Sequence, residues 1–168
     1  MTQYAAFLVF PAIMLLAAVS DLMTMRISNV MSLALLVAFC IMAYVTKMPA
    51  TAFAWSMACG LTVLLVTFGM FAMGWVGGGD AKLVSVTAVW MGWSLLLPYL
   101  LVASVFGGLL TVLLLAFRRF KLPSFMSERA WAQRLHKPRG GIPYGVALAA
   151  AGLFFYPSTQ IWLAAVGA

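Results

Sequence analysis

The sequence predicts an all-α, polytopic integral membrane protein of about six transmembrane helices, with the N- and C-termini outside. Composition carries the first part of this prediction: of the 168 residues, 65% are hydrophobic and 8% are charged. The mean hydropathy of +1.09 is far above that of a soluble domain. The charges carry the second part, because they stand at the ends of long apolar runs. The net charge of +7 therefore indicates membrane topology, and we expect no nucleic-acid partner.

The apolar runs are of the length that crosses the hydrocarbon core, which takes about 20 helical residues. Residues 83–117 are apolar throughout, which is too long for one ordinary span and short for two. We place a break at residues 92–98, because Pro98 disfavours helix at Leu97 and suits a helix start. The predicted spans are residues 3–20, 30–46, 52–76, a short helix from about 81, 98–117 and 142–166.

The basic residues test this number of spans. With the N-terminus outside, nine of the ten Lys and Arg residues fall on the inner face and Lys47 alone falls outside, in agreement with the positive-inside rule. The inner nine are Arg26, Lys82, Arg118, Arg119, Lys121, Arg129, Arg134, Lys137 and Arg139. We treat residues 1–168 as a single transmembrane domain, in which residues 118–141 form a basic cytoplasmic connection.

Apolar and basic side chains are interleaved in that connection, and Ser127 is suited to cap a short helix over residues 128–136. We expect this amphipathic helix to lie on the anionic inner leaflet, so the lipid bilayer is itself a partner. Residues 1–4 contain no Lys or Arg and make a poor signal peptide, so we expect the first segment to be retained.

Nothing in the sequence indicates a metal or a cofactor. Cys40 and Cys59 stand apart inside apolar segments and form no CxxC pair, and the sequence contains no HExxH motif. The one histidine, His136, is interpreted as an interfacial residue. A serine or cysteine nucleophile therefore has no evident histidine base.

The chain has three acidic residues: Asp21, Asp80 and Glu128. Both aspartates stand at the ends of apolar runs, and a carboxylate costs about 2.5 to 3.5 kcal/mol at a membrane helix centre and less near the interface. The predicted topology brings both aspartates to the cytoplasmic face at similar depth. We therefore take Asp21 and Asp80 as the candidate catalytic residues.

Three glycines, Gly77, Gly78 and Gly79, directly precede Asp80. Each costs about 1 kcal/mol in a helix interior relative to alanine, so together they predict the end of a helix and allow another backbone to lie close. We expect an extended substrate segment to bind along them while Asp80 faces its peptide bond. The alternative is structural: a glycine ends one helix and Asp80 caps the next from Ala81.

Two carboxylates that share a proton can hydrolyse a peptide bond without a metal, because one activates water while the other polarises the carbonyl. Two alternatives stay open. In one, the protein is a small proton-coupled transporter or channel component that uses Asp21 and Asp80 as a proton relay. In the other, it is an inactive scaffold. The three glycines beside Asp80 favour the peptidase.

At these residues the chain resembles the type IV prepilin peptidases, membrane aspartyl proteases with a GxGD signature. That signature stands here as residues 77–80. Residues 21–29, DLMTMRISN, resemble the family's D-x-x-x-x-R-I-P-N stretch, and residues 142–147, IPYGVA, resemble I-P-Y-G-P. The chain departs from the family pattern at Ser28 and Val146, where proline is usual, and at Met23, where a basic residue is common.

The resemblance implies an aspartic endopeptidase of the bacterial inner membrane that removes prepilin leaders at the cytoplasmic face. Methyltransferase and CxxC regions are absent, which resembles the short, peptidase-only branch of Flp/Tad pili, so we expect no methyltransferase activity. The implied partners are a Flp-type prepilin and, as a further candidate, the pilus assembly machinery. Prepilins of the family carry a glutamate in the mature region, and Lys82 or Arg26 is the candidate substrate-binding cation for it.

Overall fold

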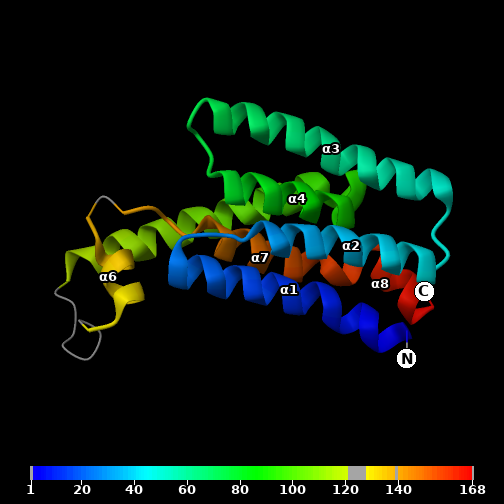
Figure 1. The fold of residues 1–168 in the computed structure, drawn as a ribbon, viewed down its shortest axis with the longest axis horizontal. Helices are drawn as coiled ribbons and strands as arrows, with labels where there is room; N and C mark the ends of the chain where they lie inside the picture. Colours follow the sequence, from blue (N-terminus) through cyan, green and yellow to red (C-terminus); the bar gives the residue numbers. More distant parts are fainter. Residues whose placement is uncertain (1, 121–127, 139, 168) are drawn as a thin grey trace.

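The computed structural model of the chain describes residues 2–120, 128–138 and 140–167, and all regular structure in these ranges is helical. The all-α prediction is therefore confirmed. In chain order the elements are α1 (Thr2–Thr24), α2 (Asn29–Val45), α3 (Ala50–Ala72), α4 (Gly78–Arg119), α6 (Ala130–His136), α7 (Tyr144–Phe155), the 3-10 turn η1 (Tyr156–Ser158) and α8 (Gln160–Val166) (Figure 1).

The long helices carry apolar side chains on their outer faces as well as their inner ones. Leu8, Leu33 and Val105 are examples of large side chains that are mostly exposed, and helices that are apolar all round suit a membrane. By length and composition, α1, α3 and α4 can each cross a membrane. The pair α7 and α8, bent by 43°, adds a fourth if it is counted as one span. Helix α2 is apolar but shorter, at 17 residues.

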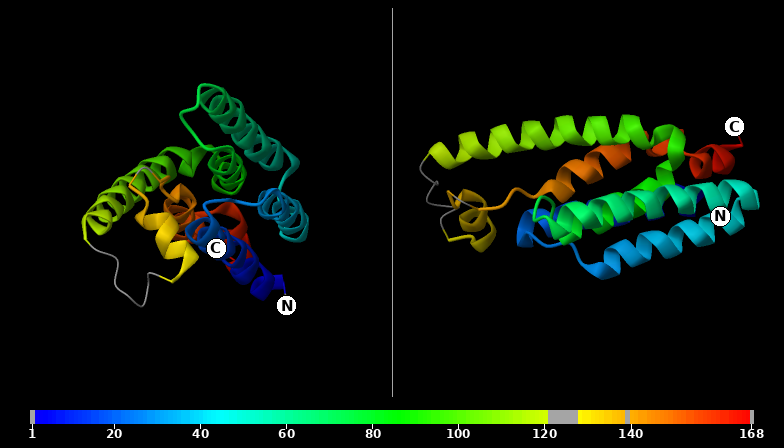
Figure 2. Two further views of the ribbon diagram at one scale, coloured as in Figure 1. Left: turned by 60° about the vertical axis from the view of Figure 1, so that its left-hand side comes forward. Right: turned by 90° about the horizontal axis from the view of Figure 1, so that it is seen from above.

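Helix α4 has 42 residues, a length of about 63 Å if it were straight, roughly twice the hydrocarbon core. It is not straight, because the backbone leaves helical geometry at Gly92 (φ 63°, ψ 178°). The chain reverses there, so that residues 78–91, the first half of α4, and residues 93–119, the second half, run in opposite directions (Figures 1 and 2). The break predicted at 92–98 is confirmed at Gly92.

Two predicted helix starts are wrong. The second half of α4 does not begin at Pro98, which lies inside it. Pro98 is near the beginning of that half, where a missing N–H removes little of the hydrogen-bond ladder. The first half begins at Gly78 rather than near Ala81, so two of the three glycines are helical.

An aromatic core fixes the first half of α4 among its neighbours. The Trp90 ring contacts Phe10 of α1 and Phe39 of α2, with ring centroids 4.9 and 5.5 Å away. Tyr156 stacks on Phe10 at 4.5 Å, and Trp90 Nε1 donates a hydrogen bond to the Leu35 carbonyl oxygen at 3.1 Å. The first half of α4 is thus packed against α1, α2 and η1.

The two ends of the helix bundle differ. Both termini and the α2–α3 turn lie at one end, whereas the α1–α2 turn, the α3–α4 turn and α6 lie at the other (Figures 1 and 2). The second end is called the site end below, because both candidate aspartates are located there.

Helix α6 lies against the protein at the site end. It begins at Ala130 rather than at residue 128, and its apolar residues Ala132 and Leu135 are buried. Arg118 of α4 donates to the carbonyl oxygens of Leu135 and Gly141, both at 2.7 Å. Arg134 Nη2 donates to the Met23 carbonyl oxygen of α1 at 2.5 Å. At these two residues the helix therefore packs on protein, and its expected place on the inner leaflet stays a prediction. Ser127, Lys121 and Arg139, which the sequence singled out, lie outside the described residues.

Candidate active site

Asp21 lies in the last turn of α1 and is buried, with 5% of its surface exposed. Its Oδ2 accepts a hydrogen bond of 2.7 Å from the backbone N–H of Gly145, which is 124 positions away in the first turn of α7. The helix ends just beyond it, because Met25 takes a left-handed conformation (φ 56°). The Ser20 hydroxyl donates to the Arg26 carbonyl oxygen at 3.0 Å and secures the turn. Asp21 is thus held rigidly between α1 and α7.

Asp80 lies in the first turn of α4, and its carboxylate turns back over Gly77. A Cβ on Gly77 would lie 3.0 Å from Asp80 Oδ2. Gly77 is the N-cap residue of α4, Met73 is the C-cap of α3, and no side chain caps α4. The alternative in which Asp80 caps the helix is therefore wrong, and its carboxylate is available for other chemistry.

Ile27, in the α1–α2 turn, packs between the backbones that carry the two aspartates. A Cβ on Gly79 would lie 3.2 Å from Ile27 Cβ, and a Cβ on Gly145 would lie 2.7 Å from Ile27 Cδ1. This side chain therefore joins the start of α4 to the start of α7, where Asp21 is bound. Gly79 directly precedes Asp80, and Gly145 donates its N–H to Asp21, so Ile27 contacts the immediate neighbour of each aspartate. The fold brings the two aspartates together at the site end.

Sequence reasoning missed Ile27 and the hydrogen bond from Gly145 as parts of the site. The signal was present, since both residues fall within the two stretches 21–29 and 142–147 that the sequence analysis singled out. Their roles depend on a contact between turns that are far apart in the chain, and a single sequence does not give that contact.

A cavity of about 880 Å³ opens beside Asp80. Asp80 is the one acidic residue among the described residues that line it, and the rest of the lining is mostly apolar. Its walls are α3, the second half of α4 and the start of α7, with Gly77, Asp80 and Val84 from the α3–α4 region. The wall residues include Thr62, Val63, Val66, Thr67, Met70, Leu96, Leu100, Ser104, Ile142, Tyr144 and Leu148.

The three glycines differ in what they face. Gly77 lines the cavity. Gly78 is in contact with Phe71, whose ring would lie 3.2 Å from an added Cβ, and Gly79 is in contact with Ile27. Gly77 alone of the three is therefore placed beside the open space, while the other two permit close packing.

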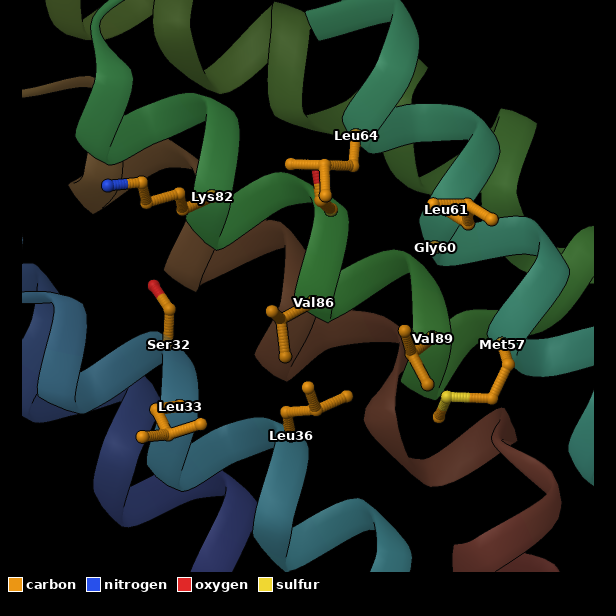
Figure 3. A pocket seen from close by; sticks show the side chains of 11 residues that line it. Ser32, Leu33, Leu36, Met57, Gly60, Leu61, Leu64, Lys82, Val86 and Val89 are labelled. Carbon is orange, nitrogen blue, oxygen red and sulfur yellow. The ribbon is translucent and has the colours of Figure 1, made fainter. Parts of the chain in front are cut away.

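The two candidate cations lie elsewhere. Lys82 Nζ donates to Asn29 Oδ1 at 2.8 Å and lines a separate groove between α2, α3 and α4 (Figure 3). Arg26 is exposed in the α1–α2 turn. Neither is part of the lining of the cavity at Asp80. Within the described ranges there is no group of three or more His, Cys, Asp or Glu residues that could hold a metal ion.

The chain was compared with protein families, with curated proteins and with solved structures. Residues 8–112 match the type IV leader peptidase family, a range that contains Asp21, the glycines and Asp80. No curated protein and no solved structure matches the chain.

Proposed function

Because this chain belongs to the type IV leader peptidase family, we propose that it is an aspartic endopeptidase that removes prepilin leaders, with Asp21 and Asp80 as the catalytic pair. The observation that carries the proposal is the contact of Ile27 with Gly79 and Gly145, which brings the start of α4, with Asp80 and its apolar cavity, next to the residue that binds Asp21. Hydrolysis of a peptide bond by two carboxylates needs this arrangement and no metal.

The two aspartates have different surroundings, and these favour different roles. Asp80 lines the cavity and is placed to meet the substrate. In its protonated form it donates a hydrogen bond to the scissile carbonyl oxygen. Asp21, held by Gly145, accepts a proton as water attacks the carbonyl carbon. Collapse of the tetrahedral intermediate breaks the C–N bond, and the leaving nitrogen takes the proton from Asp21. Two carboxyls that act on one peptide bond repel when both are ionised, which favours the singly protonated pair.

The cavity suits a substrate with an apolar helix next to the cleavage site. Leu96, Leu100 and Ser104 are spaced four residues apart on one face of the second half of α4, opposite α3. A prepilin has such a hydrophobic segment directly after its leader. We propose that the segment lies between α3 and the second half of α4, which brings the preceding peptide bond to Asp80 and Gly77.

We further propose six crossings of the bacterial inner membrane, with the site end in the cytoplasm. Reversal at Gly92 gives two antiparallel segments in α4, and placement of both termini at one end requires an even number of crossings. The described basic residues of the site end are Arg26, Lys82, Arg118, Arg119, Arg129, Arg134 and Lys137, whereas Lys47 lies in the α2–α3 turn at the other end. This distribution follows the positive-inside rule.

The proton-relay alternative is less well supported by the geometry. A relay across a membrane needs carboxylates at successive depths. Asp21 and Asp80 instead both lie at the site end, where Ile27 contacts Gly79 next to one and Gly145 next to the other. Only three acidic residues exist in the chain, and the third, Glu128, is exposed.

The proposal is tested by incubating purified protein in lipid vesicles with a Flp-type prepilin and following leader removal by mass spectrometry. Wild type should release the leader, and Asp21→Asn and Asp80→Asn should each abolish release. Each variant should melt within a few degrees of wild type, because a neutral amide replaces a carboxylate of the same shape. Glu128→Gln serves as the matched control and should cleave normally. Full turnover by a folded Asp80→Asn protein would contradict the mechanism in which Asp21 and Asp80 are the catalytic pair.

A further inference from the structure

A second groove lies between α2, α3 and the first half of α4, on the other side of α3 from the cavity at Asp80. It has a volume of about 350 Å³ and an almost wholly apolar lining. Its walls are Leu33 and Leu36 from α2, Met57, Gly60, Leu61 and Leu64 from α3, and Val86 and Val89 from α4 (Figure 3). Asp80 does not line it, so the groove is separate from the proposed peptidase site.

Two polar residues of this groove lie toward its site end, and the third, Ser85, donates its hydroxyl to the Ala81 carbonyl oxygen. Lys82 is exposed there, near the start of α4, and Ser32 is near the start of α2. The apolar side chains of Leu36, Met57 and Val89 follow further along (Figure 3). A cation at one end and hydrocarbon along the rest is the complement of an amphiphile with an anionic head.

Ser32 provides a second, independent observation. The residue is 7% exposed, and its Oγ has no hydrogen-bond partner among the described residues. Figure 3 shows the hydroxyl directed away from α2 toward the side of the groove where Lys82 lies. A buried hydroxyl without a partner is unfavourable, so a ligand that supplies an acceptor at this place is favoured.

We propose that this groove binds one anionic glycerophospholipid. An acyl chain fills the apolar groove, the headgroup phosphate pairs with Lys82, and an ester carbonyl accepts a hydrogen bond from Ser32. Basic positions between transmembrane helices at the cytoplasmic surface are suited to anionic headgroups. Lys82 also keeps Asn29 as a partner, which orients its ammonium group at the mouth of the groove. The inference does not depend on the proposed peptidase activity.

The test measures lipid retained by the purified full-length protein. Protein in a mild detergent is titrated with phosphatidylglycerol or with phosphatidylcholine of the same chains, and bound lipid is counted by native mass spectrometry. Wild type should retain one phosphatidylglycerol in preference to phosphatidylcholine. Lys82→Met should weaken phosphatidylglycerol retention about five-fold, the effect of removing one cation near the membrane surface. Lys47→Met, which removes an exposed lysine at the other end, should retain the lipid as wild type does.

Two further variants separate the groove from other lipid-binding surfaces. Val86→Phe fills the groove from its floor, and Leu33→Trp fills it from an exposed rim position that tolerates a larger side chain. Both should abolish retention of phosphatidylglycerol, and Ser32→Ala should lower it. Equal retention of the two lipids, or retention unchanged by Lys82→Met and by both filling variants, would overturn the proposal. Loss of prepilin cleavage in Leu33→Trp with lipid retention intact would instead assign the groove to the substrate helix.

Discussion

At the scale of single residues, the site depends on how closely the backbone of its glycines approaches the two aspartates. Gly145 donates its N–H to Asp21 and has no room for a side chain, while Gly77 lies directly beneath Asp80. Ile27 occupies the remaining space between the turns. The positions of both carboxylates are therefore determined by contacts that a single added methyl group would disturb.

Gly145→Ala should damage activity and stability together. The added Cβ would lie 2.8 Å from Asp21 Oδ2 and 2.7 Å from Ile27 Cδ1, so both must move. We expect a loss of about 1 to 3 kcal/mol in unfolding free energy and roughly a hundredfold loss in kcat/KM if Asp21 moves by about 1 Å. Thermal melting in detergent and prepilin cleavage measure the two effects.

The double variant Gly145→Ala with Ile27→Val separates the two contacts. The smaller valine removes Cδ1 and should recover part of the stability, while the contact with Asp21 persists and activity stays low. Gly108→Ala, at a glycine with no other atom within 4 Å of an added Cβ, is the matched control. Wild-type turnover by Gly145→Ala would mean that Asp21 is not held as described.

Gly77→Ala should affect activity and leave stability nearly unchanged. Its backbone (φ −69°, ψ 141°) accepts any residue, and the close contact is with the terminal oxygen of a side chain that can rotate away. Displacement of the Asp80 carboxylate should lower kcat/KM by roughly tenfold to a hundredfold. Gly69→Ala, where an added Cβ meets nothing, should behave as wild type. A drop in melting temperature equal to that of Gly145→Ala would contradict this account.

Ser28 accounts for one departure of the sequence from the family pattern it resembles. The residue takes φ −69°, the value that proline would impose. Its hydroxyl accepts a hydrogen bond from the Val30 N–H at 3.2 Å, so that it caps α2. Serine thus replaces the rigidity of proline with a capping hydrogen bond, which is a standard way to begin a helix.

At the scale of elements, the reversal within α4 limits most strictly which type of residue a position can hold. Gly92 combines φ 63° with ψ 178°, a region that is essentially restricted to glycine. Space is not the obstacle, because an added Cβ would approach no atom closer than Ser56 Oγ at 3.9 Å. The backbone conformation itself excludes other residues.

Gly92→Ala should therefore destabilise the fold by about 1 to 3 kcal/mol. Gly108→Ala, in the second half of the same helix, should be neutral or stabilise by up to about 1 kcal/mol, because alanine is the better helix former. Unfolding of the two variants in the same detergent gives the comparison directly. Equal stability of both would show that residue 92 does not adopt this conformation.

Much of this architecture could be predicted from the sequence, since apolar length alone marks the helices and a break near Gly92. The residues at which the helices begin and end were less predictable. The three glycines predict a helix end, yet Gly78 and Gly79 are helical, because packing of Phe71 and Ile27 against them outweighs their low helix propensity.

For α6 the amphipathic pattern was clear, but a pattern does not say whether lipid or protein covers the apolar side. Arg118 and Arg134 decide this by bonding carbonyl oxygens of neighbouring segments.

At the scale of the whole molecule, the proposed orientation has a direct test. In a background with Cys40→Ala and Cys59→Ala, Lys47→Cys and Lys137→Cys are made singly and exposed to a thiol reagent that does not cross membranes. In intact cells we expect labelling of Lys47→Cys alone, and labelling of Lys137→Cys only after the membrane is permeabilised. The reverse pattern would invert the topology, and labelling of both in intact cells would contradict an odd number of crossings between them.

Helix α3 has extensive packing against α4 and no comparable packing against another described helix. Together with the first half of α4, it lines both the Asp80 cavity and the Lys82 groove. A tilt of α3 toward the second half of α4 would narrow the cavity and widen the groove, and the opposite tilt would do the reverse. With such a tilt, a ligand in one space would lower the affinity of the other space for its ligand, and the factor would be the same in both directions. The membrane and the substrate would then act as opposing ligands of one helix.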